Sequence, residues 1–302
     1  MVLKGFDIRN EFLKEEWLTR VYLPEFENRQ LLVEMLRFDR IHPQISGNKW
    51  MKLEGWMEKY YTDGYKGIVT AGGPWSNHLH AAAYACLLHN IPMKAIIKGK
   101  EGLRNRMIED LESCNVSIEY VNRKNFYDTD YWVGSSARQN ELFIPMGGAT
   151  NEGETGVTRW MDELPLPGYD YVLAAVGTAT TLVGIGKSRL KFRHLWGFDP
   201  GTGDKSLPGK ISFLNRETTA GKARLFSANQ KLGKLSPGLG EFMGNWKSRT
   251  GITLDFVYTA PMCCAFLEMV NQGEIPPMSR VLLIHTGGTQ GNRSHPMLPM
   301  GN

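Results

Sequence analysis

Seven short runs of apolar, β-favouring residues recur along the chain, and stretches with helical patterning separate them. Alternation of this kind is typical of βαβ units, in which each strand of a parallel sheet is followed by a helix that packs on the sheet. The pattern therefore predicts an α/β protein with parallel sheets. The expected strands are GIVTA (67–71), MKAIIK (93–98), VSIEYV (116–121), ELFIP (141–145), DYVLAAV (170–176), HLWGF (194–198) and RVLLIH (280–285).

The chain is long enough for two domains, because its 302 residues exceed the roughly 100–200 residues of a typical domain. Four of the expected strands are closely spaced, and the glycine-rich stretch PMGGATNEGETG follows them. We expect residues 50–148 to form a small α/β domain, and residues 1–49 together with 149–302 to form a larger one. The Gly-, Pro- and Lys-rich stretch 200–250 has weak periodicity, so we expect a long loop excursion or a mobile cover.

Composition argues against several classes of partner. Charged residues make up 22% of the chain, the formal net charge is +4, and no dense basic block is present, so nucleic acid is not an expected partner. No stretch approaches the roughly 20 apolar residues of a membrane span, and the N-terminus lacks an apolar secretion signal. The four cysteines have no C-x-x-C metal spacing, which predicts reduced thiols, no metal site and a cytoplasmic protein.

Three loops follow expected strands and carry small or polar residues. Ligands of parallel α/β sheets bind beyond the carboxyl ends of strands, where loops lead into helix N-termini with outward-pointing N–H groups. After GIVTA comes GGPWSNH, in which Ser76 or Asn77 would cap a helix over about 78–89. The loop GTATTLVGI (177–185) has the chemistry of a phosphate cradle, and TGGTQG (286–291) is a third small turn.

Lys49 follows the turn-prone residues Ser-Gly-Asn and stands at the head of an amphipathic helix in IHPQISGNKWMKL. Each of the three loops, taken alone, is also ordinary α/β construction. Together with Lys49 they provide what a phosphorylated aldehyde cofactor requires. Lys49 supplies an amine, the loop at 177–181 supplies phosphate donors, and the helix start at 76–78 and the Thr286 hydroxyl supply polar partners for a ring.

A nucleotide-binding protein is the competing hypothesis from another class. The segment TLVGIGKS (181–188) would be a P-loop if its first residue were glycine, with Lys187 holding the phosphates, but that first residue is Thr181. No G-x-G-x-x-G follows an expected strand either. The sequence therefore favours the aldehyde cofactor.

At these positions the chain resembles the pyridoxal-phosphate enzymes of the tryptophan synthase β-like fold (fold type II). Within them it resembles the group of 1-aminocyclopropane-1-carboxylate deaminases and D-cysteine desulfhydrases. The matching pieces keep the family's order over about residues 35–291: HPQISGNKWMKL, AGGPWSNHLHAAA, FIPMGGATNEGETG, GTATTLVGI, LDFVYT and LLIHTGGTQG. The resemblance implies a two-domain, three-layer parallel-sheet fold, bound pyridoxal 5'-phosphate, a small amino-acid substrate and a homodimer.

The resemblance also implies roles for the matched residues. Lys49 would bind the cofactor aldehyde covalently and act as the base once substrate displaces it, with Ser76 and Tyr258 as the other catalytic residues. Asn77 would hydrogen-bond the ring hydroxyl. The substrate would contact Ser76, Asn77, His78 and Tyr258, and a protonated His78 would help to bind its carboxylate. The ring nitrogen and the phosphate would be contacted by Thr286 and by the amides of Gly177, Thr178, Ala179, Thr180 and Thr181.

A neutral threonine at the ring nitrogen makes the ring a weaker electron sink, which favours rapid elimination over transamination. Ring-opening deaminases of the group carry Glu directly after the tyrosine and Leu before the paired glycines, where this chain has Thr259 and Thr286. We therefore expect α,β-elimination on a small amino acid, as in D-cysteine desulfhydrase, giving a 2-oxo acid, ammonia and, from cysteine, sulfide. Two alternatives are ring-opening deaminase activity and a catalytically weak cofactor-binding homologue, because Trp75 and Leu239 depart from the family on the substrate side.

Overall fold

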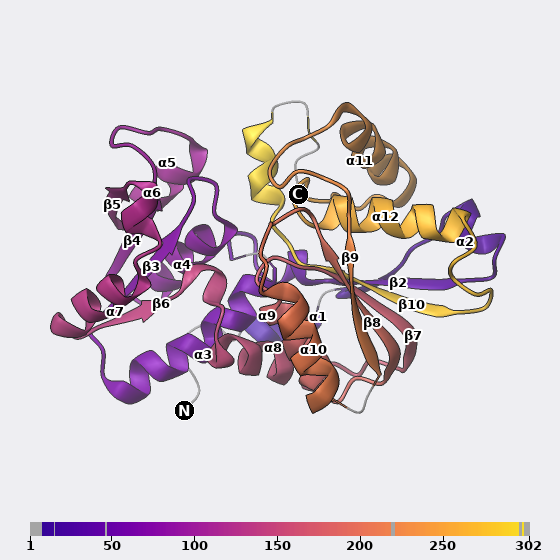
Figure 1. Ribbon diagram of the computed structural model, residues 1–302, viewed down its shortest axis with the longest axis horizontal. Coiled ribbons are helices and arrows are strands. Elements are labelled where there is room, and N and C mark those ends of the chain that lie inside the picture. Colours follow the sequence, from indigo (N-terminus) through magenta and orange to yellow (C-terminus); the bar gives the residue numbers. More distant parts are fainter. Residues whose placement is uncertain (1–7, 15, 46, 219–220, 296–297, 299–302) are drawn as a thin grey trace.

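The computed structural model describes residues 8–14, 16–45, 47–218, 221–295 and 298 (Figure 1). Ser46, in the turn before Lys49, lies outside the described residues. All seven expected strands are present, and their ends differ from the expected ones by at most two residues. The strands are β1 (Leu18–Arg20), β2 (Leu32–Arg37), β3 (Gly67–Gly72), β4 (Met93–Lys98), β5 (Ser117–Val121), β6 (Glu141–Ile144), β7 (Tyr169–Ala175), β8 (Phe192–Asp199), β9 (Lys222–Ser227) and β10 (Arg280–His285).

Helices follow most of these strands. Within the described residues, no helix combines the length and apolar character that crossing a membrane requires. The helices are α1 (Ile8–Lys14), α2 (Pro24–Glu27), α3 (Asn48–Asp63), α4 (Asn77–Leu88), α5 (Arg106–Ser113), α6 (Arg123–Phe126), α7 (Thr129–Arg138), α8 (Asn151–Glu163), α9 (Thr180–Lys187), α10 (Leu207–Glu217), α11 (Pro237–Thr250) and α12 (Thr259–Asn271), with 3-10 turns η1 (Phe38–Arg40), η2 (Met146–Gly148) and η3 (Thr289–Ser294).

The strands form two sheets, which lie side by side in Figure 1. The large sheet has the order β1-β2-β10-β7-β8-β9, and the small sheet has the order β5-β4-β3-β6. Every pair is parallel except β1 with β2, where the short edge strand runs antiparallel. The expected α/β fold with parallel sheets is confirmed, with one antiparallel strand added at an edge.

Helices cover both faces of the large sheet. Successive side chains of a strand point to opposite faces. Val172 of β7 accordingly lies in one core cluster with Leu182 of α9, and its neighbour Leu173 lies in a second cluster with Phe266 of α12. Figure 1 shows α9 and α10 on one side of these strands and α12 on the other. The large sheet is therefore the middle of three layers.

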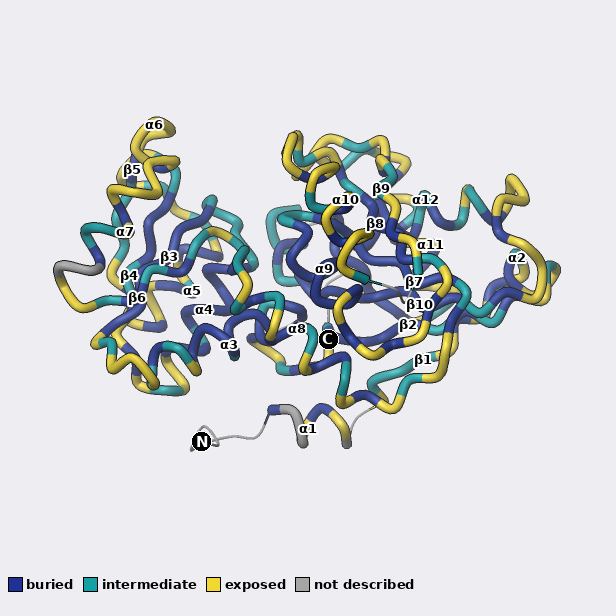
Figure 2. The backbone as a smooth tube through the Cα atoms, turned by 60° about the horizontal axis from the view of Figure 1, so that its bottom comes forward, coloured by how far each residue is buried: buried dark blue, intermediate teal, exposed yellow. Residues whose placement is uncertain are grey.

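The small sheet shares the first core cluster with the large sheet, because α3 packs on both α4 and α8. Its other face is covered by Phe126 and Trp132 of α6 and α7. Figure 2 shows the central strands of both sheets as mostly buried and the outer helices and turns as partly exposed. All four strands of the small sheet fall inside the predicted small domain. The domain boundaries stay a prediction, and their outer ends at 1–7 and 299–302 lie outside the described residues.

The expectation of a loop or mobile cover at 200–250 is wrong. This stretch contains α10, β9 and α11, and β9 pairs with β8 along its length. Two of its three prolines, Pro208 and Pro237, lie in the first turn of α10 and α11, where the missing N–H has no helical partner to lose. Ser236 caps α11 by accepting a hydrogen bond from the N–H of Leu239. Proline therefore starts helices here.

Candidate active site

Lys49 lies in the first turn of α3, two residues after Gly47. The backbone of Gly47 (φ 83°, ψ −166°) is in a region that glycine alone adopts readily. Its N–H donates to Phe38 O (2.8 Å), and the N–H of Asn48 donates to Thr286 O (3.2 Å). A Cβ at position 47 would lie 2.0 Å from Thr286 O, so no larger residue fits. The small residues before Lys49 thus let the start of α3 lie against the loop after β10.

Asn48 connects Lys49 to the loop after β7. Lys49 Nζ donates to Asn48 Oδ1 (2.8 Å), and Asn48 Nδ2 donates to Thr181 Oγ1 (2.6 Å). Two hydrogen bonds and one carboxamide group span at most about 8 Å, so the Lys49 amine lies within that distance of the Thr181 hydroxyl. The structure thus brings together Lys49, the 177–181 loop and Thr286, as the sequence predicted.

The 177–181 loop presents free backbone donors. Within the described residues, the N–H groups of Gly177, Thr178 and Ala179 make no hydrogen bond, and the first N–H groups of α9 have no partner within the helix. Ala179 has φ 64° and ψ −9°, a left-handed conformation that is uncommon for a residue with a Cβ. The Thr178 and Thr180 hydroxyls bond each other at 2.9 Å. Adjacent free amides at a helix N-terminus form an anion-binding concavity.

Two further lysines, which the sequence analysis missed, lie near this loop. Lys52 is 4% exposed, and its Nζ lies 3.4 Å from Gly147 O. Lys210 of α10 donates to Thr178 O (3.1 Å). Burial and the charges of Lys49 and Lys210 lower the pKa of Lys52 well below its ordinary value, with Glu154 acting in the opposite direction. A buried amine of this kind favours an anion nearby. Its position three residues after Lys49, on the same helix face, was the available signal.

The amine of Lys49 has an altered pKa. Burial lowers it to about 8, and the Asp255 carboxylate partly offsets that effect. Asp255 is 1% exposed, and it accepts hydrogen bonds from the N–H groups of Val257, Tyr258 and Thr259 at the start of α12 (2.8–3.0 Å). An amine with a pKa near 8 is partly neutral at neutral pH and can act as a nucleophile. The sequence analysis missed Asp255, although an Asp just before a helix is a common cap.

Tyr258 lies against the phosphate-type loop. A Cβ at Gly177 would lie 3.4 Å from Tyr258 Cε1 and 3.5 Å from its hydroxyl oxygen. Burial, with the charges of Asp255 and Asp199, raises the pKa of Tyr258 to about 12. The hydroxyl therefore keeps its proton at neutral pH and can donate it. The next residue, Thr259, is fully buried and donates its hydroxyl proton to Asp255 Oδ1 (2.7 Å).

The N-terminus of α4 lies beside the third loop. Ser76 is the cap of this helix, because its Oγ accepts a hydrogen bond from the N–H of Leu79 (3.2 Å). Asn77 Oδ1 accepts a hydrogen bond from Gln290 Nε2 of η3 (2.8 Å). A Cβ at Gly288 would lie 2.7 Å from Asn77 Nδ2. The loop at 286–291 is thus in contact with the residues predicted to bind the ring hydroxyl and the substrate.

The sequence leaves the protonation state of His78 open, and its surroundings favour the neutral imidazole. His78 is 2% exposed, and burial together with Lys49 and Lys52 lowers its pKa to about 3. Thr70 Oγ1 donates its single proton to Ile144 O (2.7 Å), so it accepts a hydrogen bond from His78 Nε2 (2.9 Å). Nδ1 is then the bare nitrogen, and it has no partner within the described residues. His78 can accept a hydrogen bond there but contributes no positive charge.

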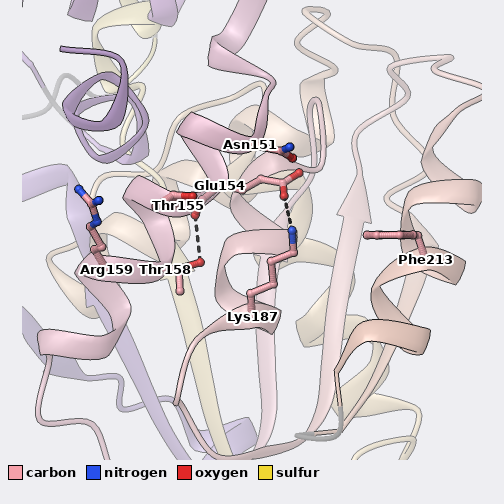
Figure 3. Close-up of a pocket in the computed structure, with 7 residues that line it drawn as sticks. All are labelled: Asn151, Glu154, Thr155, Thr158, Arg159, Lys187 and Phe213. Atoms are coloured by element: carbon pink, nitrogen blue, oxygen red, sulfur yellow. Dashed lines mark hydrogen bonds and ion pairs between the residues drawn. The ribbon is translucent and has the colours of Figure 1, made fainter. Parts of the chain in front are cut away.

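The structure contradicts the P-loop alternative. Lys187 lies at the C-terminal end of α9, where its Nζ donates to Glu154 Oε2 of α8 at 2.6 Å (Figure 3). The free amides of the 177–181 loop lie at the opposite end of this eight-residue helix, about 10 Å away along its axis. Lys187 therefore does not face the anion-binding concavity.

Trp75 and Leu239, the two residues that differ from the resembled family on the expected substrate side, differ in burial. Leu239 is 2% exposed and belongs to the core cluster that contains Met243 and Trp246 of the same helix. Trp75 is half-buried in the turn before α4. Leu239 is therefore a core residue in this structure.

Comparison with known proteins agrees with the resemblance seen in the sequence. No family model matches the chain. A Thermotoga maritima protein named "Putative 1-aminocyclopropane-1-carboxylate deaminase" is 28% identical over 279 residues, which covers 82% of this chain and 85% of the relative. A D-cysteine desulfhydrase of Salmonella choleraesuis is 24% identical over 313 residues, covering 90% of each chain.

Among solved structures, a 1-aminocyclopropane-1-carboxylate deaminase homologue matches with a TM-score of 0.76 at 22% identity. The match covers 94% of this chain and 95% of that chain, so the two proteins share their fold. Fold, motif order and relatives agree: the chain is similar to 1-aminocyclopropane-1-carboxylate deaminases and D-cysteine desulfhydrases, and it has the fold type II architecture.

Proposed function

We propose that this chain is a pyridoxal 5'-phosphate-dependent lyase that catalyses α,β-elimination on a small amino acid, with D-cysteine as the preferred type of substrate. The products are a 2-oxo acid, ammonia and, from cysteine, sulfide. One observation carries the proposal: Asn48 bonds to the Lys49 amine, to the Thr181 hydroxyl at the end of the 177–181 loop, and through its N–H to the carbonyl of Thr286. The names of the relatives, which include both activities, support it.

The residues present fit this cofactor. The free amides at Gly177, Thr178 and Ala179 would hold its phosphate, and the buried Lys52 would add a charge. Lys49 would bond to its aldehyde, Asn77 would contact the ring hydroxyl, and Thr286 would contact the ring nitrogen. When bound, the cofactor supplies an electron-withdrawing ring conjugated to the substrate nitrogen, which weakens the substrate Cα–H bond.

The titratable groups near Lys49 can move the protons that elimination requires. With a pKa of about 8, the Lys49 amine can accept the proton from the substrate Cα. The electrons of that bond form a C=C bond, and the Cβ–S bond breaks with its electron pair on sulfur. The Tyr258 hydroxyl, which keeps its proton up to a pH of about 12, can donate a hydrogen bond to the departing sulfur, and the proton that Lys49 has accepted can pass to that sulfur. Water then converts the unsaturated amine into the 2-oxo acid and ammonia.

The N-terminus of α4 would bind the substrate carboxylate. Helix N-termini attract anions, and the first N–H groups of α4 have no partner within the helix. Ser76 Oγ accepts from the N–H of Leu79, so its hydroxyl proton is available to donate to a carboxylate. His78 is neutral, so the attraction to the carboxylate comes from these donors and not from an imidazolium.

Position 259 favours elimination over ring opening. The resemblance places a glutamate there in ring-opening deaminases, whereas Thr259 is buried and bonded to Asp255. This residue therefore has no carboxyl group to move a proton at a substrate. Ring-opening deaminase activity is the second candidate function, because relatives of that name match the chain at similar identity.

The absorption spectrum of the purified protein tests the proposal. Incubation with pyridoxal 5'-phosphate should give a yellow protein, and Lys49→Ala should abolish the visible band. Lys59→Ala, in the same helix but half-exposed and paired with Asp63, should leave the band unchanged. A wild-type protein that stays colourless after incubation would contradict the proposal.

Product assays then separate the candidate activities. D-cysteine, β-chloro-D-alanine, D-serine and 1-aminocyclopropane-1-carboxylate are each supplied, and 2-oxo acid release is measured. Release from D-cysteine with sulfide supports the desulfhydrase, and release from the cyclopropane alone supports the deaminase. A yellow protein that releases no product from any of the four is a cofactor-binding homologue without this catalysis.

The proposal extends to assembly and location. The family resemblance supports a homodimer, and the absence of disulfides among Cys86, Cys114, Cys263 and Cys264 supports the cytoplasm. The molar mass in solution, measured by light scattering at several concentrations, tests the first of these; a monomer at every concentration would contradict it.

A further inference from the structure

The side chain of Asn77, next to the small sheet, is hydrogen-bonded by Gln290, which follows the last strand of the large sheet. Asn77 begins α4, which follows β3 of the small sheet, and Gln290 lies in η3, which follows β10 of the large sheet. Gln290 Nε2 donates to Asn77 Oδ1 at 2.8 Å, across 213 residues of sequence. On the other side of the same amide, a Cβ at Gly288 would lie 2.7 Å from Asn77 Nδ2. The loop at 286–291 therefore contacts the amide of Asn77 at both its oxygen and its nitrogen.

Gln290 is itself anchored to the small sheet's helices. Its backbone carbonyl accepts a hydrogen bond from Arg293 Nε (3.0 Å), and the Arg293 guanidinium forms a bidentate pair with Asp110 of α5. His80 of α4 contacts the same carboxylate (Nε2–Oδ2 3.2 Å). In Figure 1, the yellow η3 lies on the side of the large sheet that faces α5. A bidentate arginine–carboxylate pair has a fixed geometry, so this contact holds η3 in register with α4.

The bond from Gln290 decides which way the Asn77 amide points. An amide has one acceptor oxygen and two donor hydrogens. Since the oxygen accepts from Gln290, the Nδ2 hydrogens are what Asn77 has left to offer to a ligand. A donor stabilises an ionised oxygen, whereas an acceptor requires that oxygen to keep its proton.

We propose that Gln290 is a positioning residue that orients the Asn77 amide so that its N–H donates to the ring oxygen of bound pyridoxal 5'-phosphate and keeps this oxygen ionised. This inference rests on the proposed function, because it concerns the same site. Arg293 and Asp110 support it by holding η3 against α4 and α5.

Two substitutions of Gln290 separate orientation from packing. Gln290→Glu preserves size but replaces the donor by an acceptor, so Asn77 must turn its Nδ2 toward position 290 and its oxygen toward the ring. Gln290→Met preserves approximate size and removes the hydrogen bond without reversing it. If Gln290 only fills space, the glutamate variant should be the milder one; if it orients Asn77, the glutamate variant should be the more severe.

The readout is the visible absorption of the cofactor-loaded protein as a function of pH, because the form with an ionised ring oxygen absorbs at longer wavelength than the protonated form. In Gln290→Glu we expect the protonated form to persist to a pH about one to two units higher than in the wild type, which corresponds to one charge-assisted hydrogen bond. Gln290→Met should shift the transition by less. Gln272→Glu, the same substitution at an exposed position, should not shift it.

Asn77→Asp provides a second measurement that leaves Gln290 in place. The aspartate can accept from Gln290 but can present only an acceptor to the ring oxygen, so its transition should move in the same direction as in Gln290→Glu. An unchanged transition in both variants, or a shift in Gln290→Met as large as in Gln290→Glu, would overturn the inference. A wild-type protein that does not become yellow would instead contradict the proposed function.

Discussion

Replacing Gly47 by alanine tests how the start of α3 reaches the candidate site. Gly47 occupies a backbone region that costs other residues about 1–3 kcal/mol. An added Cβ would lie 2.0 Å from Thr286 O, so the backbone must move and the hydrogen bond from the N–H of Asn48 to Thr286 O must lengthen or break. That bond contributes about 0.5–1.5 kcal/mol. We therefore expect Gly47→Ala to lower the free energy of unfolding by about 2–4 kcal/mol.

Gly64→Ala is the matched control, because Gly64 ends the same helix. Its φ is 71°, in the left-handed region, and no atom lies within 4 Å of an added Cβ. Backbone strain alone should then cost about 1–2 kcal/mol. The difference between the two variants isolates the close approach of Gly47 to the loop after β10.

Urea unfolding followed by tryptophan fluorescence gives the stability of both variants, and titration with pyridoxal 5'-phosphate gives the affinity. A displacement of about 1 Å in a reacting group can lower a rate about 100-fold. The cofactor capture rate, which is the rate at which the visible band grows after pyridoxal 5'-phosphate is added, should therefore fall at least tenfold in Gly47→Ala. It should remain near the wild-type value in Gly64→Ala. Equal stability and equal capture rates in the two variants would refute the reasoning.

Three further predictions follow from the charges near the site. Lys52→Met should weaken cofactor binding about 10- to 100-fold while it stabilises the cofactor-free protein, because an apolar side chain replaces a buried amine whose protonation is disfavoured there. Melting temperatures with and without cofactor measure both effects, and Lys59→Met is the control. Asp255→Asn should lower the pKa of Lys49 further, because the carboxylate raises it, and the acid limb of the cofactor capture rate should move to lower pH. Burial raises the pKa of Asp110, but hydrogen bonds from His80 and Arg293 outweigh this and hold it at about 2, so its contribution to stability is present above about pH 4 and is lost as the pH falls toward 2. Asp110→Asn should therefore cost about 1–2 kcal/mol at neutral pH after solvent screening and flatten the dependence of the urea midpoint between pH 4 and pH 2.

Local patterns were sufficient for most of the fold. The bounds of β4 and β10 agree with the expected runs, since an unbroken apolar run between turn residues is a strong strand signal. The same reasoning fails at 200–250, where Pro208 and Pro237 begin helices and do not mark a loop. Proline breaks a helix interior but fits the first turn, and the sequence alone did not separate these cases at this spacing.

The candidate site was predictable in part. Lys49 and the loops at 177–181 and 286–291 are predictable because glycine-containing turns next to strands and helices form short local patterns in the sequence. Asp255 and Gln290 were not identified, because their importance depends on partners far away in the sequence. The protonation state of His78 could not be predicted from the sequence. It depends on burial, and the tautomer depends on the hydrogen bond that Thr70 donates to Ile144 O.

The positive charges around the 177–181 loop lower the stability of the folded protein when no anion is bound there. Lys52 is buried, and its nearest charged influences include Lys49 and Lys210, which repel it. A phosphate dianion between the loop amides and these amines would reverse the sign of that interaction. Because a ligand that binds the folded state alone stabilises it, cofactor at a hundredfold excess over its dissociation constant should add about 2.7 kcal/mol to the free energy of unfolding. In Lys52→Met the dissociation constant should rise, so the gain in stability at the same cofactor concentration should be smaller.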